Sequence, residues 1–370
     1  MLLALSACEG RTVTAFEEGI SFGEEGELDA DQGDQDDQDD QDDQDESGDS
    51  GGCAAIVESL TITDSTDRAS VACVEEVLGD LNIGPTTQLT DLGMLSELRS
   101  VGGMLYIAGN LNLGSLEGLE QLESVESLYV RRNRELLDLE GLSGLDWVDV
   151  ITVDNNDGLV ALDGLSLGLS PSVLEISANE NLDSLAGLPT FLSSGMRGPL
   201  TITVADNPHL EDLAGLSDCC SERSPKLEVS RNDSLTDLAG LEAFDRIESL
   251  TLHDNSSMVR LVGIAGISEI QFIDIEYNQC LEDGAPALID LVGADNLTTI
   301  GTLHVSWASS LTSLAGLGGL VDLEKLRIQN NSALPWSSVE DLTAQSGPLV
   351  IDSCGGEGGP PCPSEECPLY

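Results

Sequence analysis

Short runs of alternating apolar and polar residues recur along most of this chain, and each run ends shortly before an asparagine. The clearest copy has Leu105 and Ile107 separated by one residue, with Asn110 three positions further on. Alternation over so short a run predicts a β-strand with its aliphatic side chains on one face. Leucines then follow every third residue, with Gly118 between them, which predicts a return path with a different, turn-rich backbone.

The same unit repeats about every 23 residues. The asparagines of its copies are Asn110, Asn133, Asn156, Asn179, Asn207, Asn232, Asn255, Asn278 and Asn331. Thr86 and Ala308 stand at the asparagine position after two further strand patterns, Leu81/Ile83 and Leu303/Val305, and weaker patterns at Leu60/Ile62 and Leu349/Ile351 flank the series. Because one unit cannot bury its own apolar face, we expect about 11 units to stack around one core.

Stacked copies of one strand are expected to form a parallel sheet with its aliphatic side chains inward. The repeated asparagine can hydrogen-bond the backbone of neighbouring turns, which satisfies polar groups that the bend would otherwise bury unpaired. Helical periodicity is weak in the second half of each unit, so turns or short strands are expected there rather than long helices.

The stretch from Ser100 to Asn110, which includes Val101, Gly102 and the strand around Ile107, resembles the signature of receptor L-domains. The resemblance covers roughly residues 73–352. It implies a mostly β fold, a right-handed parallel β solenoid of the receptor L-domain or leucine-rich-repeat type, with about 11 turns of roughly 23 residues. It also implies that ligands or partners bind an exposed sheet face. Such solenoids serve many unrelated binding roles, so the resemblance names no ligand.

Two turns are longer than the others, at residues 189–199 and 280–297. The added residues are expected to form protruding loops, and loops on a rigid scaffold often carry specificity.

The chain is strongly acidic, with 68 acidic and 14 basic side chains and a formal net charge of −54. Such a surface repels nucleic acid and anionic lipid, so both are poor partners. Residues 9–52 have no apolar periodicity, and residues 31–45 are almost entirely Asp and Gln. We expect this segment to be a disordered acidic linker that acts as a spacer. Because it lacks the spacing of an EF-hand loop, diffuse divalent-cation binding is expected there rather than a calcium site.

The first eight residues are expected to be a lipoprotein-type signal that ends at Cys8. The sequence from Leu5 to Cys8 resembles the bacterial lipobox, in which small residues precede a cysteine that is lipidated. The resemblance implies lipidation of Cys8 and a bacterial surface lipoprotein, exported and anchored to the outer membrane or the cell surface. The alternative is a short apolar start with a chance cysteine.

The remaining boundaries follow from the repeats: residues 53–352 form the solenoid, with an amino-terminal cap at 53–80, and residues 353–370 form a Cys/Gly/Pro-rich tail. The cysteines after Cys8 are even in number, which fits an oxidising compartment. We expect the first disulfide between Cys53 and Cys73 and the second within the tail; free buried thiols are the alternative. The disulfide candidates are Cys53, Cys73, Cys219, Cys220, Cys280, Cys354, Cys362 and Cys367, with Cys219 or Cys220 as a partner for Cys280.

Two groups on the outward side of the strands are candidates for a ligand face. Aromatic and arginine side chains are typical binding anchors, and a basic group in so acidic a chain is also a candidate anion site. The alternative, which we favour for each group, is a solvated face whose arginines balance nearby carboxylates. The first group comprises Tyr106, Tyr129, Arg131, Arg132 and Arg134, and the second comprises His304, Trp307, Lys325 and Arg327.

No motif in the sequence predicts catalysis. Residues 48–52 match the segment around a serine-protease nucleophile, but no histidine precedes them. Residues 164–168 match a nucleophile elbow, but they fall in an ordinary return path without a strand-to-helix turn. No cofactor motif or metal-ligand cluster is recognisable, so we expect neither a cofactor nor a metal site.

The sequence therefore predicts a non-enzymatic, surface-tethered binding or adhesion module that uses the exposed sheet face to bind protein or glycan. The alternative is a structural envelope spacer without a specific ligand, and an enzyme is a third, less favoured hypothesis.

Overall fold

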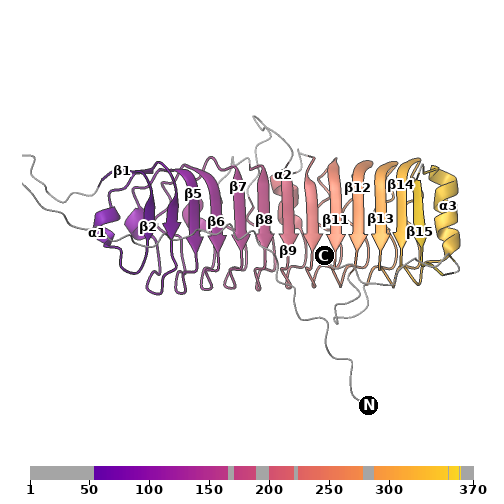
Figure 1. The fold of residues 1–370 in the computed structure, drawn as a ribbon, viewed down its shortest axis with the longest axis horizontal. Helices are drawn as coiled ribbons and strands as arrows, with labels where there is room; N and C mark the ends of the chain where they lie inside the picture. The colour runs from indigo at the N-terminus through magenta and orange to yellow at the C-terminus, as the bar shows by residue number, and fades with distance from the viewer. Residues whose placement is uncertain are drawn as a thin grey trace, which may run out of the picture. The chain divides into compact units, whose positions relative to one another are not determined.

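The computed structural model describes residues 54–165, 171–188, 200–220, 224–277, 287–348, 350–357 and 359. These residues form one sheet of fifteen strands (Figure 1). The strands are β1 Ile56–Val57, β2 Leu60–Ile62, β3 Glu76–Val77, β4 Leu81–Ile83, β5 Ser100–Ala108, β6 Ser124–Arg131, β7 Val150–Asp154, β8 Val173–Ser177, β9 Thr201–Ala205, β10 Lys226–Ser230, β11 Ile247–His253, β12 Glu269–Glu276, β13 Thr299–Ser306, β14 Asp322–Gln329 and β15 Val350–Cys354. Every pairing between them is parallel, which confirms a parallel β solenoid of about 11 turns of about 23 residues.

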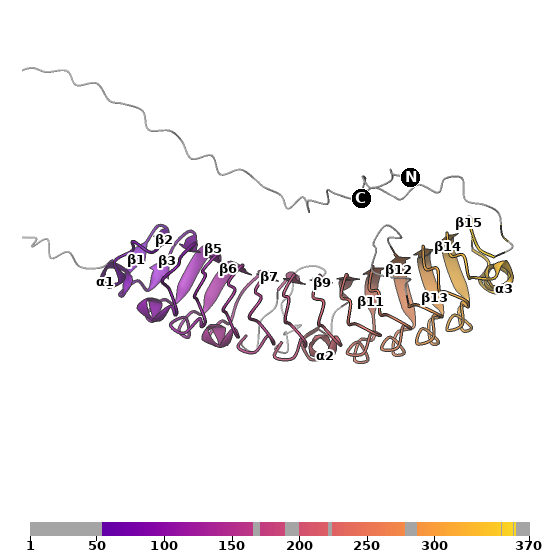
Figure 2. The same cartoon turned by 90° about the horizontal axis from the view of Figure 1, so that it is seen from below.

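The register places equivalent residues of successive turns side by side, as the repeat predicts. Leu105 is opposite Leu128, and Ile107 is opposite Val130. These inward aliphatic side chains have no exposed surface. One apolar core runs the length of the solenoid, from Ile62 to Leu342. The stacked turns curve, with the sheet on the inner side of the curve and the return paths on its outer side (Figure 2).

The return paths consist mainly of turns, as predicted. Their regular pieces are the 3₁₀ helices η1 Gly93–Leu95 and η2 Glu140–Leu142, and the helices α1 Arg68–Val71, α2 Ala214–Cys220 and α3 Trp336–Ser346. None of the helices in the described residues is long and apolar enough to cross a membrane.

Helix α3 differs from the prediction of turns and short strands, because its eleven residues make it the longest helix of the described residues. Val339 and Leu342 join the core, and the Nε2 of Gln345 donates hydrogen bonds to the carbonyls of Leu317, Gly318 and Leu320 at 3.1, 3.1 and 2.8 Å. The helix thus satisfies carbonyls of the preceding return path and helps to cover the carboxyl-terminal end of the stack.

Both ends of the sheet extend beyond the predicted core repeats. The expected cap segment contains β1, β2 and α1, and β1 pairs with β3 while β2 pairs with β4. At the other end, Cys354 lies in β15 instead of in the tail that we expected to begin at residue 353. Cys73 and Cys354 are both disulfide-bonded. The pairing of each with a particular cysteine stays a prediction.

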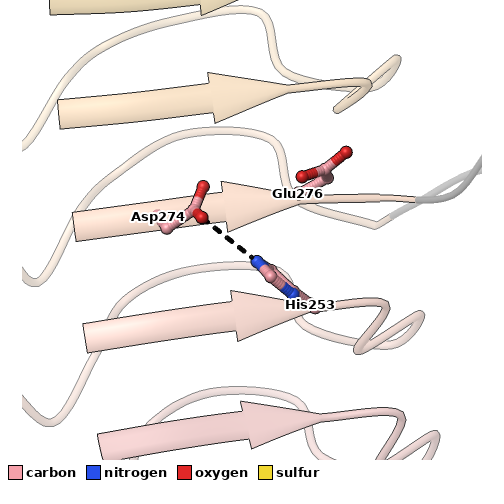
Figure 3. Close-up of side chains that lie close together, drawn as sticks. All are labelled: His253, Asp274 and Glu276. Carbon is pink, nitrogen blue, oxygen red and sulfur yellow. Dashed lines mark ion pairs between the residues drawn. The ribbon is translucent and has the colours of Figure 1, made fainter. Parts of the chain in front are cut away.

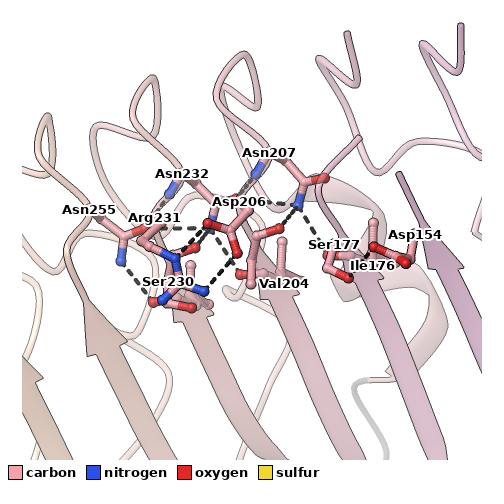
Figure 4. Close-up of polar contacts among 12 residues, drawn as sticks. Asp154, Ile176, Ser177, Val204, Asp206, Asn207, Ser230, Arg231, Asn232 and Asn255 are labelled. Carbon is pink, nitrogen blue, oxygen red and sulfur yellow. Dashed lines mark hydrogen bonds and ion pairs between the residues drawn. The ribbon is translucent and has the colours of Figure 1, made fainter. Parts of the chain in front are cut away.

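A ladder of buried asparagines runs along the stack, as expected. The backbone N–H of each of six asparagines, Asn110 to Asn232, donates to the Oδ1 of the next at 3.0–3.2 Å. The Nδ2 of each also donates to a carbonyl of the preceding turn, as Asn207 does to Ile176 at 3.0 Å (Figure 4). Both side-chain ends are therefore used, and each amide satisfies two buried backbone groups of the preceding turn, one N–H and one C=O.

The residue before each ladder asparagine is in the left-handed region, an arrangement that the sequence did not reveal. At this position φ is 70° for Gly109, 54° for Arg132, 57° for Asp206 and 57° for Asn330. This conformation turns the chain out of the strand, and the asparagine that follows it is buried.

We predict that Asn179→Ala lowers the free energy of unfolding by about 2–5 kcal/mol, because it leaves buried backbone groups unpaired. Asn179 accepts from the N–H of Asn156 at 3.0 Å and donates to the carbonyl of Val153 at 3.0 Å. The matched control is Asn181→Ala, since Asn181 is exposed and makes one bond, to Asp157; its expected cost is below about 1 kcal/mol. Urea denaturation followed by circular dichroism measures both, and equal losses would contradict the ladder's role.

We predict that Gly240→Ala is strongly destabilising. Its φ is +106°, and an added Cβ would lie 2.2 Å from the carbonyl carbon of Leu213 in the preceding turn. The left-handed conformation alone costs about 1–2 kcal/mol with a side chain, and the backbone contact adds to it. Gly318→Ala is the control, because a Cβ there meets no atom within 4 Å. In thermal denaturation, Gly240→Ala should lower the midpoint and Gly318→Ala should leave it unchanged or slightly raised.

Candidate functional site

The outward side of the sheet presents two columns of side chains, which the register aligns across the turns. Tyr106, Tyr129 and Thr152 begin the first column, and Asp274, His304 and Arg327 lie towards its end. The second column runs from Ala108 and Arg131 through Ser230, His253, Glu276 and Ser306 to Gln329. The return paths, α2 included, lie on the other side of the sheet (Figure 2).

The predicted neighbours Tyr106 and Tyr129 are in contact at the amino-terminal end of this face. Their ring centroids are 6.1 Å apart and their planes are tilted by 55°. This is a favourable aromatic geometry, and both side chains are half-buried. The pair offers a fixed apolar surface with two hydroxyl groups.

Of the three predicted arginines near the tyrosines, two form ion pairs and one is exposed to solvent. Arg131 lies beside the pair, and its Nε is 2.7 Å from Asp154 Oδ2. Burial opposes the charged form of Arg131, but the hydrogen bond and the charge of Asp154 outweigh it and raise the pKa of the guanidinium. Arg134 pairs with Asp157 at 3.1 Å, and Arg132 is an exposed turn residue. Arg131 and Arg134 therefore balance carboxylates, as the alternative predicted.

The register places His304 of the second predicted group beside Arg327, but Trp307 lies apart from them. Trp307 has a φ of 62° and packs against the core, because the left-handed turn takes it out of the outward columns. His304 turns towards Asp274 on the preceding strand. Lys325 and Arg327 are exposed on β14.

The structure instead brings two histidines and two carboxylates together across β11, β12 and β13. Figure 3 shows three of them, His253, Asp274 and Glu276. The Nε2 of His253 is 3.4 Å from Asp274 Oδ2, and the Nδ1 of His304 is 2.7 Å from Asp274 Oδ1. Glu276 follows Asp274 on the same face of β12, in register with His253 and Ser306. His253, Asp274 and Glu276 each offer one ligand atom, and these atoms all lie within 4.8 Å of one another.

This cluster also holds buried polar atoms without hydrogen-bond partners. Within the described residues, such atoms are the Oγ of Ser230 and Ser306 and the Nε2 of His304, while the Nε2 of His253 and Oδ1 of Asp274 make only the ion-pair contacts given above. All five belong to four adjacent strands, β10 to β13, and lie on the outward face. The two serine side chains are almost fully buried, with Ser230 at 0% and Ser306 at 3% exposure. Buried polar groups are normally hydrogen-bonded, so their concentration in one patch indicates a ligand-binding site.

The charges of the cluster shift its pKa values in different directions. Burial raises the pKa of Asp274, but its contacts with His253 and His304 outweigh that effect, so the pKa of this carboxyl is well below its usual range. Burial raises the pKa of Glu276, and the charge of Asp274 adds to that shift. Burial opposes the imidazolium of His253, but Asp274 and the nearby glutamates outweigh it, so the pKa of His253 is raised. Asp274 is thus the fixed negative centre of the site.

The sequence did not predict this patch, where potential metal ligands from three strands converge. Metal sites are recognisable in a sequence when their ligands lie close together in the chain. Here His253, Asp274 and His304 are each separated by a whole turn of the solenoid. The repeat alignment does contain the signal: His253 and Glu276 share the second column, and Asp274 and His304 share the first.

Several predicted sites lie outside the described residues. These are Cys8, the acidic linker 9–52, the protease-like segment 48–52, residues 166–168 of the elbow-like match, the insertions at 189–199 and 280–286, and Cys53, Cys280, Cys362 and Cys367. Cys219 and Cys220 end α2, so their backbone is described.

No protein-family model matches the chain. A search of curated proteins likewise finds no match.

We predict that Asp274→Asn lowers the pKa of His253. In the wild-type protein Asp274 and the nearby glutamates outweigh the effect of burial, and the substitution removes the largest of these favourable contributions. Proton NMR of the histidine rings across pH, with chelator present, measures the shift. His209 is an internal control, because it contacts the carbonyl of Glu180, away from the cluster. An unchanged His253 pKa would contradict the assigned cause.

Proposed function

We propose that this chain is a non-enzymatic binding module of the receptor L-domain type, which binds a protein or glycan on the outward face of its sheet. The observation that carries the proposal is the tilted pair of Tyr106 and Tyr129, half-buried on a sheet face that the return paths leave uncovered. Tyrosines present a large, rigid surface with a polar tip at low conformational cost, which suits both protein and sugar ligands.

The charge of the face narrows the ligand class. Glu175, Glu228 and Asp274 lie in the first column, and Asp154 and Glu276 lie in the second. Arg131 is already paired with Asp154 and adds little net positive charge. A neutral glycan or a protein surface with basic side chains is therefore favoured over an anionic ligand.

The arrangement of polar side chains supports binding over catalysis. A serine nucleophile needs a hydrogen bond to a base that is itself oriented by a third group. His253 is close to Asp274, but neither Ser230 nor Ser306 makes a side-chain hydrogen bond. A binding surface fits these contacts better than a triad does.

Tethering to the cell envelope is the second part of the proposal. The lipobox-like sequence before Cys8 supports a lipid anchor, and the acidic linker would hold the solenoid away from the membrane. Disulfides between Cys53 and Cys73 and within the tail would staple both ends, in keeping with export. The alternative remains a structural envelope spacer without a specific ligand.

We predict that Tyr106→Ala combined with Tyr129→Ala weakens attachment at least about 10-fold, because paired aromatic anchors carry a large share of binding energy. The assay is attachment of purified protein, with Cys8 replaced by serine, to producing cells that lack the gene. Periodate-treated cells test a glycan ligand, and protease-treated cells test a protein ligand. The control is Leu111→Ala combined with Leu137→Ala, which removes exposed leucines outside the sheet face.

The spacer alternative predicts a different result. Attachment that is unaffected by the tyrosine variant and by Lys325→Ala with Arg327→Ala would rule out a binding role for the sheet face. Attachment lost equally in the leucine control would show that the loss is not specific to that face.

For the anchor, we predict that Cys8→Ser abolishes palmitate labelling and releases the protein from the membrane fraction. The reason is that the thiol of Cys8 would carry the lipid. Membrane association that persists in Cys8→Ser would overturn the lipoprotein assignment without affecting the proposal for the sheet face.

A further inference from the structure

The cluster at β11–β13 carries an inference that does not depend on a role for the tyrosine pair. Four side chains with metal-ligand chemistry converge there from three adjacent strands: His253, Asp274, Glu276 and His304. The register fixes their arrangement, since neighbouring strands lie about 4.8 Å apart and alternate residues share a face. This spacing brings a histidine on one strand within reach of a carboxylate on the next.

The distances between the ligand atoms fit a small transition-metal ion. Zinc binds imidazole nitrogen and carboxylate oxygen tetrahedrally at about 2.0–2.2 Å, which places its ligand atoms about 3.4 Å apart. The candidate atoms of His253, Asp274 and Glu276 all lie within 4.8 Å of one another. Side-chain rotations of about 1 Å would bring them to the tetrahedral spacing.

An unpartnered buried hydroxyl provides a second, independent observation. The Oγ of Ser306 has no hydrogen-bond partner, and Ser306 neighbours Glu276 in the second column. Ser306 is 3% exposed and its side chain lies on the same face as the cluster. A water bound to an ion at His253, Asp274 and Glu276 would give this buried hydroxyl a partner.

We propose that His253, Asp274 and Glu276 bind one divalent transition-metal ion of the zinc class, with His304 as the residue that orients Asp274. An imidazole ligand favours such ions over calcium and magnesium, which prefer oxygen ligands alone. Carboxylates that bind a metal are usually held in place by a hydrogen bond from an outer group, and His304 contacts Asp274 at 2.7 Å. The ion would join β11 to β12 on the outward face of the sheet.

The test is calorimetric titration of zinc chloride into the full chain after chelator treatment. Millimolar calcium and magnesium are present, so that the acidic linker does not register as a zinc site. We expect one tight site per chain. His253→Ala and Glu276→Gln should each weaken it more than about 10-fold, and His304→Gln by about 10–100-fold. His209→Ala, which changes an exposed histidine, should leave the affinity unchanged.

Glu276→Gln keeps the shape of its side chain, so it tests the site even if His253→Ala disturbs folding. NMR provides a second readout, since zinc should shift the ring signals of His253 and leave those of His209 in place. Zinc binding of the same affinity in both ligand variants, or only weak binding of many ions, would overturn the proposal.

Discussion

The structure depends on hydrogen bonding of the backbone where each strand turns back into the solenoid. At that bend, N–H and C=O groups are buried between turns and have no partner in their own strand. The asparagine ladder supplies the partners. The side chain of Asn179 accepts from the N–H of Asn156 and donates to the carbonyl of Val153, both in the preceding turn. Its own backbone N–H donates to Asn207 in the following turn. The strands can stack in register because the backbone N–H and C=O groups at each bend are hydrogen-bonded in the same way.

The ladder also explains which positions are free to vary. Inward aliphatics, ladder asparagines and the glycines that approach the preceding turn are fixed by packing. The two outward columns have no such constraint, and their residues change from Tyr and Arg at one end to Asp, His and Glu nearer the other. Neighbouring residues in a column are a whole turn apart in sequence, but in space they are separated only by the distance between two adjacent strands. Functional chemistry on this fold is therefore assembled across turns and not within a motif.

The regular stacking of turns determines which structural features can be predicted from the sequence. The parallel sheet, the inward leucines, the ladder and the contact between Tyr106 and Tyr129 follow from the repeat spacing, because register transfers the pattern from one turn to the next. The position of Trp307 could not be predicted in this way. It lies one residue beyond the strand, where a left-handed φ directs it to the core. Helix α3 was also missed, since it replaces a turn-rich path only at the end of the stack.

The histidine–carboxylate cluster was overlooked for a related reason. Its members appear in the aligned columns, but a column shows proximity along one direction only, whereas the cluster joins two columns and three strands.

The overall charge of the chain affects how selective a metal site on it can be. In a chain of net charge −54, cations of every kind are concentrated near the surface, so charge alone cannot select among them. Selectivity at β11–β13 would have to come from the imidazole of His253, the one feature of the proposed ligand set that the many carboxylates elsewhere on the surface do not share.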